Sequence, residues 1–295
     1  MSAKITEHLH ECAKGLDQRP MPEIAALIVD GQLNAVAAVQ NAIEDICAGA
    51  ATMAQSIRDG GCIHYIAAGS SGLMAAADAQ ELGGTFSIPA KQLCILMAGG
   101  LPTGVEMPGD TEDDTKGLKH ALANLSGRDT VIAVSASGST PYTLAAAQIA
   151  NTCGAALIGI ANNEGARLLE MADHSIFLKT PPEVLSGSTR MGAGTAQKIA
   201  LNTLSTLMAI DLGHVHDGMM VNLFADNIKL RNRAKGIVGQ IAQVSPKAAS
   251  DALDAAGGHI KPAVLIAKLG VSHDAAIARL TQTDGHLRPA LEQPT

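Results

Sequence analysis

The feature that most constrains the fold of this chain is an alternation of short apolar runs with helical segments. Five runs have the length and β-branched content of buried strands, and they span residues 62–68, 92–98, 129–136, 155–161 and 174–180. Between them lie segments with apolar residues at helical spacing. Strands that alternate with helices predict an α/β fold, a doubly wound parallel sheet flanked by helices.

The helical segments divide the chain into two expected parts. In the first part we predict helices over residues 21–58 (one or two helices), 73–82, 112–125, 140–153, 196–213 and 219–238. The tail differs in character, because Ser-Pro, Gly-Gly and Gly-Val-Ser punctuation separates three short helical segments at 245–258, 260–270 and 272–282. We therefore expect a domain with an N-terminal helical arm over 1–239 and a three-helix C-terminal module over 240–295.

Composition favours a small ligand over a nucleic acid or an anionic membrane. The formal net charge is −7, and among 295 residues there are two Tyr, three Phe and no Trp on which bases could stack. The five cysteines are scattered without metal-ligand spacing, as expected of reduced thiols. The sequence shows neither a secretion signal nor about 18 uninterrupted apolar residues, so we expect a cytoplasmic protein.

Three loops rich in serine, threonine and glycine follow predicted strands: AAGSSG (67–72), SASGST (135–140) and SGSTRMGAG (186–194). Parallel sheets bind ligands at the carboxyl ends of their strands, so these loops are expected to meet at one edge. Glycines allow close approach, and hydroxyl and N–H groups suit an oxyanion. Ordinary helix capping is the alternative interpretation. The predicted anion-binding residues are Gly69, Ser70, Ser71, Gly72, Ser135, Ser137, Gly138, Ser139, Thr140, Ser186, Ser188, Thr189 and Arg190.

Other motifs are weaker. Ala67 occupies the first glycine position of a dinucleotide fingerprint, and no GxxxxGK[ST] is present. Arg190 either binds an anion or makes a structural ion pair with Glu183 or a neighbouring acid. His214 and His216 with Asp217 resemble a metal motif, but without further ligands they are more typical of polar loop residues, and we expect no metal.

Several longer motifs resemble a known family. GSSG (69–72), ASGSTPY (136–142) and SGSTRMGAGTAQKIALNTLST (186–206) resemble the sugar isomerase (SIS) phosphosugar-binding family. The resemblance is strongest to the N-acetylmuramic acid 6-phosphate etherases. It covers nearly the whole chain, including TE at 6–7, DAxE at 78–81, ED at 112–113 and NxKLRxR at 227–233.

The resemblance implies a homodimeric lyase that acts on the lactyl ether of a cell-wall amino-sugar phosphate without a metal or redox cofactor. It implies that Glu81 protonates the departing lactate oxygen and that Glu112 takes the proton at C2 beside the open-chain aldehyde. Water then adds to the unsaturated intermediate, and the products are N-acetylglucosamine 6-phosphate and lactate. Elimination needs one ionised and one protonated carboxyl. Glu81 lies in an apolar-rich segment, which favours its protonated form.

This sequence departs from the family pattern at positions that are usually cationic. Leu73 and Ser139 stand where the family carries Arg, and Gly192 stands where it carries Lys. If all three positions line the pocket, the site favours a less anionic ligand. If those cations point elsewhere, their loss is neutral. Two other functions remain open: a non-catalytic phosphosugar sensor that controls a partner protein, and an aldose–ketose phosphate isomerase that needs only one base.

Overall fold

The structure is a computed structural model that describes residues 4–108, 111–223, 225 and 227–293. The chain divides into two compact units. The first contains the residues up to Ala79 together with Lys91–Ser205, and the second contains Gln80–Ala90 together with the residues from Thr206 onward. Each unit has a hydrophobic core of its own.

The first unit is built on a five-stranded sheet with the order β2-β1-β3-β4-β5. All four strand pairings are parallel. The strands are β1 (Ile63–Ala67), β2 (Leu93–Met97), β3 (Thr130–Val134), β4 (Ala156–Ala161) and β5 (His174–Phe177). The predicted α/β fold is confirmed. The strand order reverses beside β1, and ligands of open α/β sheets bind at such a reversal.

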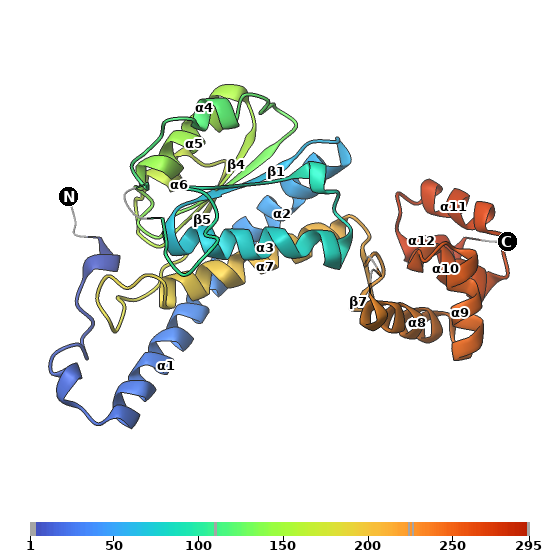
Figure 1. Ribbon diagram of the computed structural model, residues 1–295, viewed down its shortest axis with the longest axis horizontal. Coiled ribbons are helices and arrows are strands. Elements are labelled where there is room, and N and C mark those ends of the chain that lie inside the picture. The colour runs from blue at the N-terminus through green and yellow to red at the C-terminus, as the bar shows by residue number, and fades with distance from the viewer. Residues whose placement is uncertain (1–3, 109–110, 224, 226, 294–295) are drawn as a thin grey trace. The chain divides into compact units, whose positions relative to one another are not determined.

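Helices cover both faces of this sheet (Figure 1). The helices that begin in this unit are α1 (Met21–Val39), α2 (Ile43–Arg58), α3 (Gly69–Phe86), α4 (Leu118–Ala121), α5 (Pro141–Cys153), α6 (Arg167–Met171) and α7 (Gly192–Asp211), with the 3₁₀ turns η1 (Ile5–Glu7), η2 (Leu16–Gln18), η3 (Gln40–Ala42) and η4 (Ala90–Gln92). Among them α1 extends away from the sheet (Figure 1). Alternate strand residues face opposite helices: Leu157 belongs to the core shared with α5, whereas Ile158 contacts the position of Gly49 on α2.

Three helix predictions for this part of the chain need correction. The helix expected over 112–125 is reduced to the four residues of α4, because Gly117 takes a left-handed φ of 88° directly before it. Glu112 therefore lies in a loop. The helix expected over 73–82 begins earlier, at Gly69, so the GSSG motif forms its first turn. Likewise α7 begins at Gly192 and not at residue 196.

The second unit contains the helices α8 (Ile228–Ala242), α9 (Pro246–Ala255), α10 (Ile260–Leu269), α11 (His273–Gln282) and α12 (Leu287–Glu292). Ser245 and Ser272 cap α9 and α11 by accepting a backbone N–H three residues later. The three predicted tail helices are present, and α12 follows them. The boundary expected at 239/240 falls inside α8, which packs against α9 and α10.

The helix expected over 219–238 is wrong in its first half. Met219–Met220 (β7) instead pairs with Val215–His216 (β6) in a hairpin. Asp217 and Gly218 form the turn with φ values of 47° and 74°, as a two-residue hairpin requires. Residues 224 and 226 of the expected helix lie outside the described part of the chain.

Two basic side chains of the second unit are taken out of water. Lys261 is 7% exposed, and its Nζ donates a hydrogen bond to the carbonyl of Gly285 at 2.8 Å. Burial lowers its pKa to about 8. Nδ1 of His214 is buried without a hydrogen-bond partner. Burial, with the charges of Lys261 and His286, lowers the pKa of His214 to about 3.

The first helix carries an exposed apolar stripe. Val29, Leu33 and Val36 follow one another at helical spacing and are 56%, 62% and 38% exposed. The helical stretch Met21–Arg58 is long and apolar enough to cross a membrane by length and composition alone, with only 17% of its most apolar window buried. An exposed apolar face of this kind is typical of an interaction surface.

Candidate active site

Two of the three hydroxyl loops meet where the sheet order reverses, at the carboxyl ends of β1 and β3. There a cavity of about 160 Å³ opens within the first unit. It lies at the first turn of α3 and at Thr140, the N-cap residue of α5. Its lining residues are Thr6, Glu7, Ala68, Gly69, Ser70, Ser71, Glu112, Ser135, Ala136, Ser137, Thr140, Gly187 and Thr189. The predicted convergence of three loops is met by the 67–72 and 135–140 loops, whereas the 186–194 loop contributes only Gly187 and Thr189.

The 135–140 loop is held by its own hydroxyl groups. Ser135 Oγ lies 2.8 Å from Thr140 Oγ1 and 3.2 Å from Ser137 Oγ, and it also accepts the Gly138 N–H at 3.1 Å. Ser139 donates to Ser137 Oγ from both its backbone N–H and its hydroxyl. Each oxygen can exchange a hydrogen bond with a neighbour for one with a ligand, so the loop offers preformed hydrogen-bonding groups.

Two glycines are required by this geometry. Gly138 has φ 63°, and a Cβ there would lie 2.3 Å from the Cβ of Ala166. Gly69 has φ 55°, and a Cβ there would lie 2.7 Å from Oε1 of Glu112. The absence of a side chain at Gly69 therefore allows the Glu112 carboxylate to approach the first turn of α3.

Glu112 is placed by its backbone. Its carbonyl accepts the N–H of Tyr142 at 3.0 Å, which joins the loop to the first turn of α5. The side chain is exposed and lines the cavity next to the hydroxyl groups of Ser70 and Ser71. A carboxylate in this position is open to solvent and accessible to a bound substrate.

Glu81 belongs to the second compact unit, not to the unit that contains the cavity. It lies on α3 in the segment Gln80–Ala90, which belongs to the second compact unit, and it is not a lining residue of the cavity. Its side chain is exposed. The apolar residues next to Glu81 in the sequence therefore do not bury its carboxyl group, contrary to the expectation from the sequence.

The third hydroxyl loop contributes less than predicted. Gly187 and Thr189 line the cavity, whereas Ser188 and Arg190 do not, and Ser186 donates instead to the carbonyl of His8 at 3.4 Å. Gly72 also lies outside the lining and packs against Met97, whose Cγ would be 2.8 Å from a Cβ on Gly72.

The first turn of α7 is occupied by a side chain. The buried carboxylate of Glu183 accepts the N–H groups of Gly192 at 3.0 Å and Ala193 at 2.9 Å. The helix start after SGSTRMGAG is therefore capped by an acid from its own loop. The capping interpretation holds for α7, and the oxyanion interpretation suits the starts of α3 and α5. Glu183 is thereby engaged with backbone N–H groups of α7.

The predicted site residues do not include any residue of the N-terminal segment. Thr6 and Glu7 line the cavity, although they precede β1 by more than fifty residues. Thr6 is buried and exchanges two hydrogen bonds with Asn163: its N–H donates to Oδ1 at 3.3 Å, and Nδ2 donates to its hydroxyl at 3.1 Å. The TE motif of the family resemblance was the only signal for these residues.

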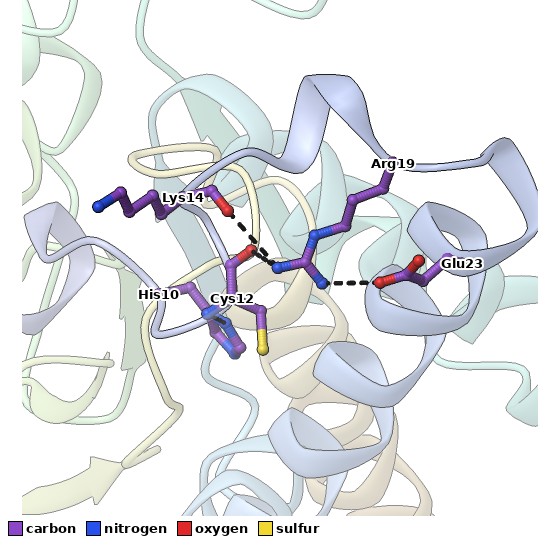
Figure 2. A network of polar contacts seen from close by, with 5 residues as sticks. All are labelled: His10, Cys12, Lys14, Arg19 and Glu23. Atoms are coloured by element: carbon purple, nitrogen blue, oxygen red, sulfur yellow. Dashed lines mark hydrogen bonds and ion pairs between the residues drawn. The ribbon is translucent and has the colours of Figure 1, made fainter.

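A hydrogen-bond network holds the remainder of this N-terminal segment (Figure 2). The guanidinium of Arg19 donates to the carbonyls of Cys12 and Lys14 and pairs with Glu23 of α1 at 3.0 Å. The Cys12 N–H donates to Nδ1 of His10 at 3.1 Å. The segment is thus tied to the start of α1.

Among the described residues, no group of three or more His, Cys, Asp or Glu side chains gathers as metal ligands do. His216 instead lies 3.6 Å from Asp217 within the hairpin of the second unit. The candidate site consists of hydroxyl groups, backbone N–H groups and carboxylates.

Comparison with known proteins places this geometry in a family. The SIS domain family matches residues 108–212. The N-acetylmuramic acid 6-phosphate etherase of Deinococcus radiodurans is 40% identical over 290 residues, covering 97% of this chain and 94% of that protein. The chain belongs to the N-acetylmuramic acid 6-phosphate etherase family. Relatives of the same name from Geobacillus sp. and Mycolicibacterium smegmatis are each 36% identical and cover 97% and 99% of this chain, and 98% of each relative.

A solved structure shows the same fold at lower identity. A crystal structure assigned as a sugar-phosphate isomerase from Listeria monocytogenes matches with a TM-score of 0.50 and 15% identity. It covers 66% of this chain and 93% of its own. This likeness concerns the fold alone.

The three positions at which the resemblance implies a cation, Leu73, Ser139 and Gly192, do not share one environment. Leu73 is half-buried on α3, and Ser139 lies at the outer end of the hydroxyl loop. A side chain at Gly192 would begin 3.1 Å from both the Ala35 Cβ and Glu183 Oε2. A lysine at 192 would start beside a buried carboxylate. None of the three lines the 160 Å³ cavity, so their neutrality does not by itself retune that cavity.

Proposed function

We propose that this protein is a carbon–oxygen lyase that cleaves the lactyl ether of N-acetylmuramic acid 6-phosphate, or of a close relative of that sugar. The observation that carries the proposal is the position of Glu112 beside the hydroxyl loops that end β1 and β3, in a chain that belongs to the etherase family. The expected products are N-acetylglucosamine 6-phosphate and lactate.

In this proposal the cavity holds the sugar phosphate. Ser70, Ser71, Ser137 and Thr140 offer hydroxyl donors, and the first turns of α3 and α5 present backbone N–H groups with the positive ends of the helix dipoles. Neutral donors of this kind bind a phosphate without requiring a positive side chain inside the cavity.

Glu112 is the proposed base. With the sugar in its open-chain form, the proton at C2 is acidified by the neighbouring aldehyde, and an exposed carboxylate is suited to take it. The electron pair forms a C2–C3 double bond as the C3–oxygen bond breaks. Glu81 is the proposed acid that protonates the departing lactate oxygen. Water then adds across the double bond to give the product.

We also propose a homodimer, formed through the apolar stripe of α1. Val29, Leu33 and Val36 are exposed along one face of that helix, and burial of such side chains contributes about 1.5–3 kcal/mol each. Sedimentation of the purified protein is expected to give twice the chain mass of 30.1 kDa. Leu33→Glu is expected to give monomers. Binding of the monomer to lipid vesicles would instead identify the stripe as a membrane surface.

We propose a cytoplasmic location, and the free thiols of the cysteines support it. All five, which lie within the described ranges, are free thiols, and proteins of reducing compartments keep their cysteines in this form.

The proposal is tested by incubating the purified protein with N-acetylmuramic acid 6-phosphate and measuring lactate. Release of lactate with the appearance of N-acetylglucosamine 6-phosphate is expected. Thermal stabilisation by the sugar without lactate release would replace the lyase by a phosphosugar sensor. Exchange of the C2 proton without loss of the side group would indicate an isomerase.

A further inference from the structure

A second cavity also borders the hydroxyl loop, within the same compact unit. Its volume is about 500 Å³, and Ser137 lines both cavities. The second cavity is basic: its described lining includes Lys4, Arg167 and Lys179 and one acid, Glu164. This concentration of positive charge contrasts with the formal charge of −7 for the whole chain.

The 160 Å³ cavity has the opposite character. Its described lining includes the carboxylates of Glu7 and Glu112 and no lysine, arginine or histidine. An anion that enters it approaches two carboxylates at once. Coulomb repulsion between such groups is about 1 kcal/mol at 4 Å in water and several times larger near a protein surface. A cation close to the loop would offset that repulsion.

Lys4 is placed to supply this charge. Its Nζ donates a hydrogen bond to Ser139 Oγ at 2.6 Å, and Ser139 Oγ donates to Ser137 Oγ at 3.1 Å. Ser137 in turn lies 3.2 Å from Ser135. A continuous line of hydrogen bonds therefore joins the Lys4 ammonium to the hydroxyl groups that line the 160 Å³ cavity.

The position of Lys4 is fixed by its neighbours in sequence. Thr6 is buried and paired with Asn163, and Asn163 also donates to the carbonyl of Ala136 at 3.2 Å within the hydroxyl loop. The segment that carries Lys4 is thus bonded to the loop at two points, Thr6 through Asn163 and Lys4 through Ser139.

We propose that Lys4 is a specificity-determining residue that binds an anionic group of the substrate, with Arg167 and Lys179 adding to the positive potential. This inference rests on the proposed function. It assigns to the N-terminal segment a role in recognising the substrate, beyond that of closing the cavity.

The experiment compares Lys4→Met with Lys14→Met. Methionine keeps the aliphatic length and removes the charge, and Lys14 is an exposed lysine of the same segment. Lys4→Met is expected to raise KM for N-acetylmuramic acid 6-phosphate about tenfold with kcat within about twofold. Because Lys4 is exposed, the difference is expected to shrink as salt rises from about 0.05 to about 0.5 M. Lys14→Met is expected to match the native protein, and Lys4→Arg to recover most of the affinity.

Binding of two ligands identifies the group that Lys4 recognises. If Lys4→Met weakens binding of N-acetylglucosamine 6-phosphate as much as that of N-acetylmuramic acid 6-phosphate, Lys4 binds the phosphate. If only the latter is weakened, Lys4 binds the lactyl carboxylate. Unchanged KM in Lys4→Met, or a Lys4→Arg variant as impaired as Lys4→Met, would overturn the proposal while leaving the lyase activity established. Absence of lactate release by the native protein would instead refute the proposed function.

Discussion

The two compact units differ in the polar groups that they bury. In the first unit many of these groups are hydroxyls, amides and carboxylates that hydrogen-bond one another or the backbone, as Asp78 does with Tyr65, Asn202 and Ser205, while Nδ1 of His64 is buried without a partner. In the second unit Lys261 is buried and His214 is half-buried with a buried Nδ1, and both have lowered pKa values. These lowered pKa values predict that the stability of the second unit depends on pH.

The largest expected effect concerns the first unit. Glu112→Gln keeps the shape of the side chain and removes the base, so kcat for lactate release is expected to fall by a factor of about 10²–10⁴. Asp113→Asn is the matched control, because Asp113 is the adjacent exposed acid and does not line the cavity. Equal losses in both variants would remove Glu112 from its proposed role.

Backbone geometry of the hydroxyl loop gives the next effect. Gly138→Ala places a Cβ 2.3 Å from Ala166 at a φ of 63°, so it is expected to cost about 3 kcal/mol of unfolding free energy. Gly165→Ala is the control, since its φ is 65° but no atom lies within 4 Å of the new Cβ. Only the conformational cost, about 1 kcal/mol, is expected there. Urea denaturation measures both, and equal losses would show that the close contact with Ala166 is relieved without cost.

Much of this arrangement follows from local sequence. The five strands were predictable because each is a short apolar run between turn residues. The predicted helix over 112–125 is wrong because Gly117 adopts a left-handed conformation there. The predicted helix over 219–238 is wrong in its first half because Asp217-Gly218 forms a hairpin turn. The loops after β1 and β3 could be placed at one sheet edge from strand direction alone. Thr6, Glu7 and Lys4 could not be placed there, because their position depends on a tertiary contact with Asn163 and Ser139.

Lys261 is expected to make the stability of the second unit depend on pH in the alkaline range. Its pKa is about 8 in the folded chain and 10.5 for an ordinary exposed lysine, so between these values the unfolded state binds more protons. Stability of the second unit therefore rises with pH in this window, by about 2 kcal/mol from about pH 7.5 to 9.5. Hydrogen exchange of α8 to α10 reports it. Lys261→Gln is expected to lose this rise, and persistence of the rise in that variant would assign it to other groups.

The smallest effect is expected on the acid side. The pKa of His214 is about 3 when folded against an ordinary value of 6.5, so its contribution is complete above pH 6.5 and is lost as pH falls toward 3. From about pH 7 to 5.5 the second unit is expected to lose about 1 kcal/mol. His214→Asn should flatten this dependence in α8 to α10. An unchanged slope in the variant would show that His214 does not cause it.

The most direct test of the proposed elimination follows atoms from water into the sugar. The reaction is run with N-acetylmuramic acid 6-phosphate in D₂O and, separately, in ¹⁸O-labelled water, and the products are analysed by mass spectrometry and NMR. Deuterium at C2 and ¹⁸O at C3 of N-acetylglucosamine 6-phosphate, with unlabelled lactate, is the predicted result. Appearance of ¹⁸O in lactate and no deuterium at C2 would contradict elimination and indicate direct hydrolysis of the ether.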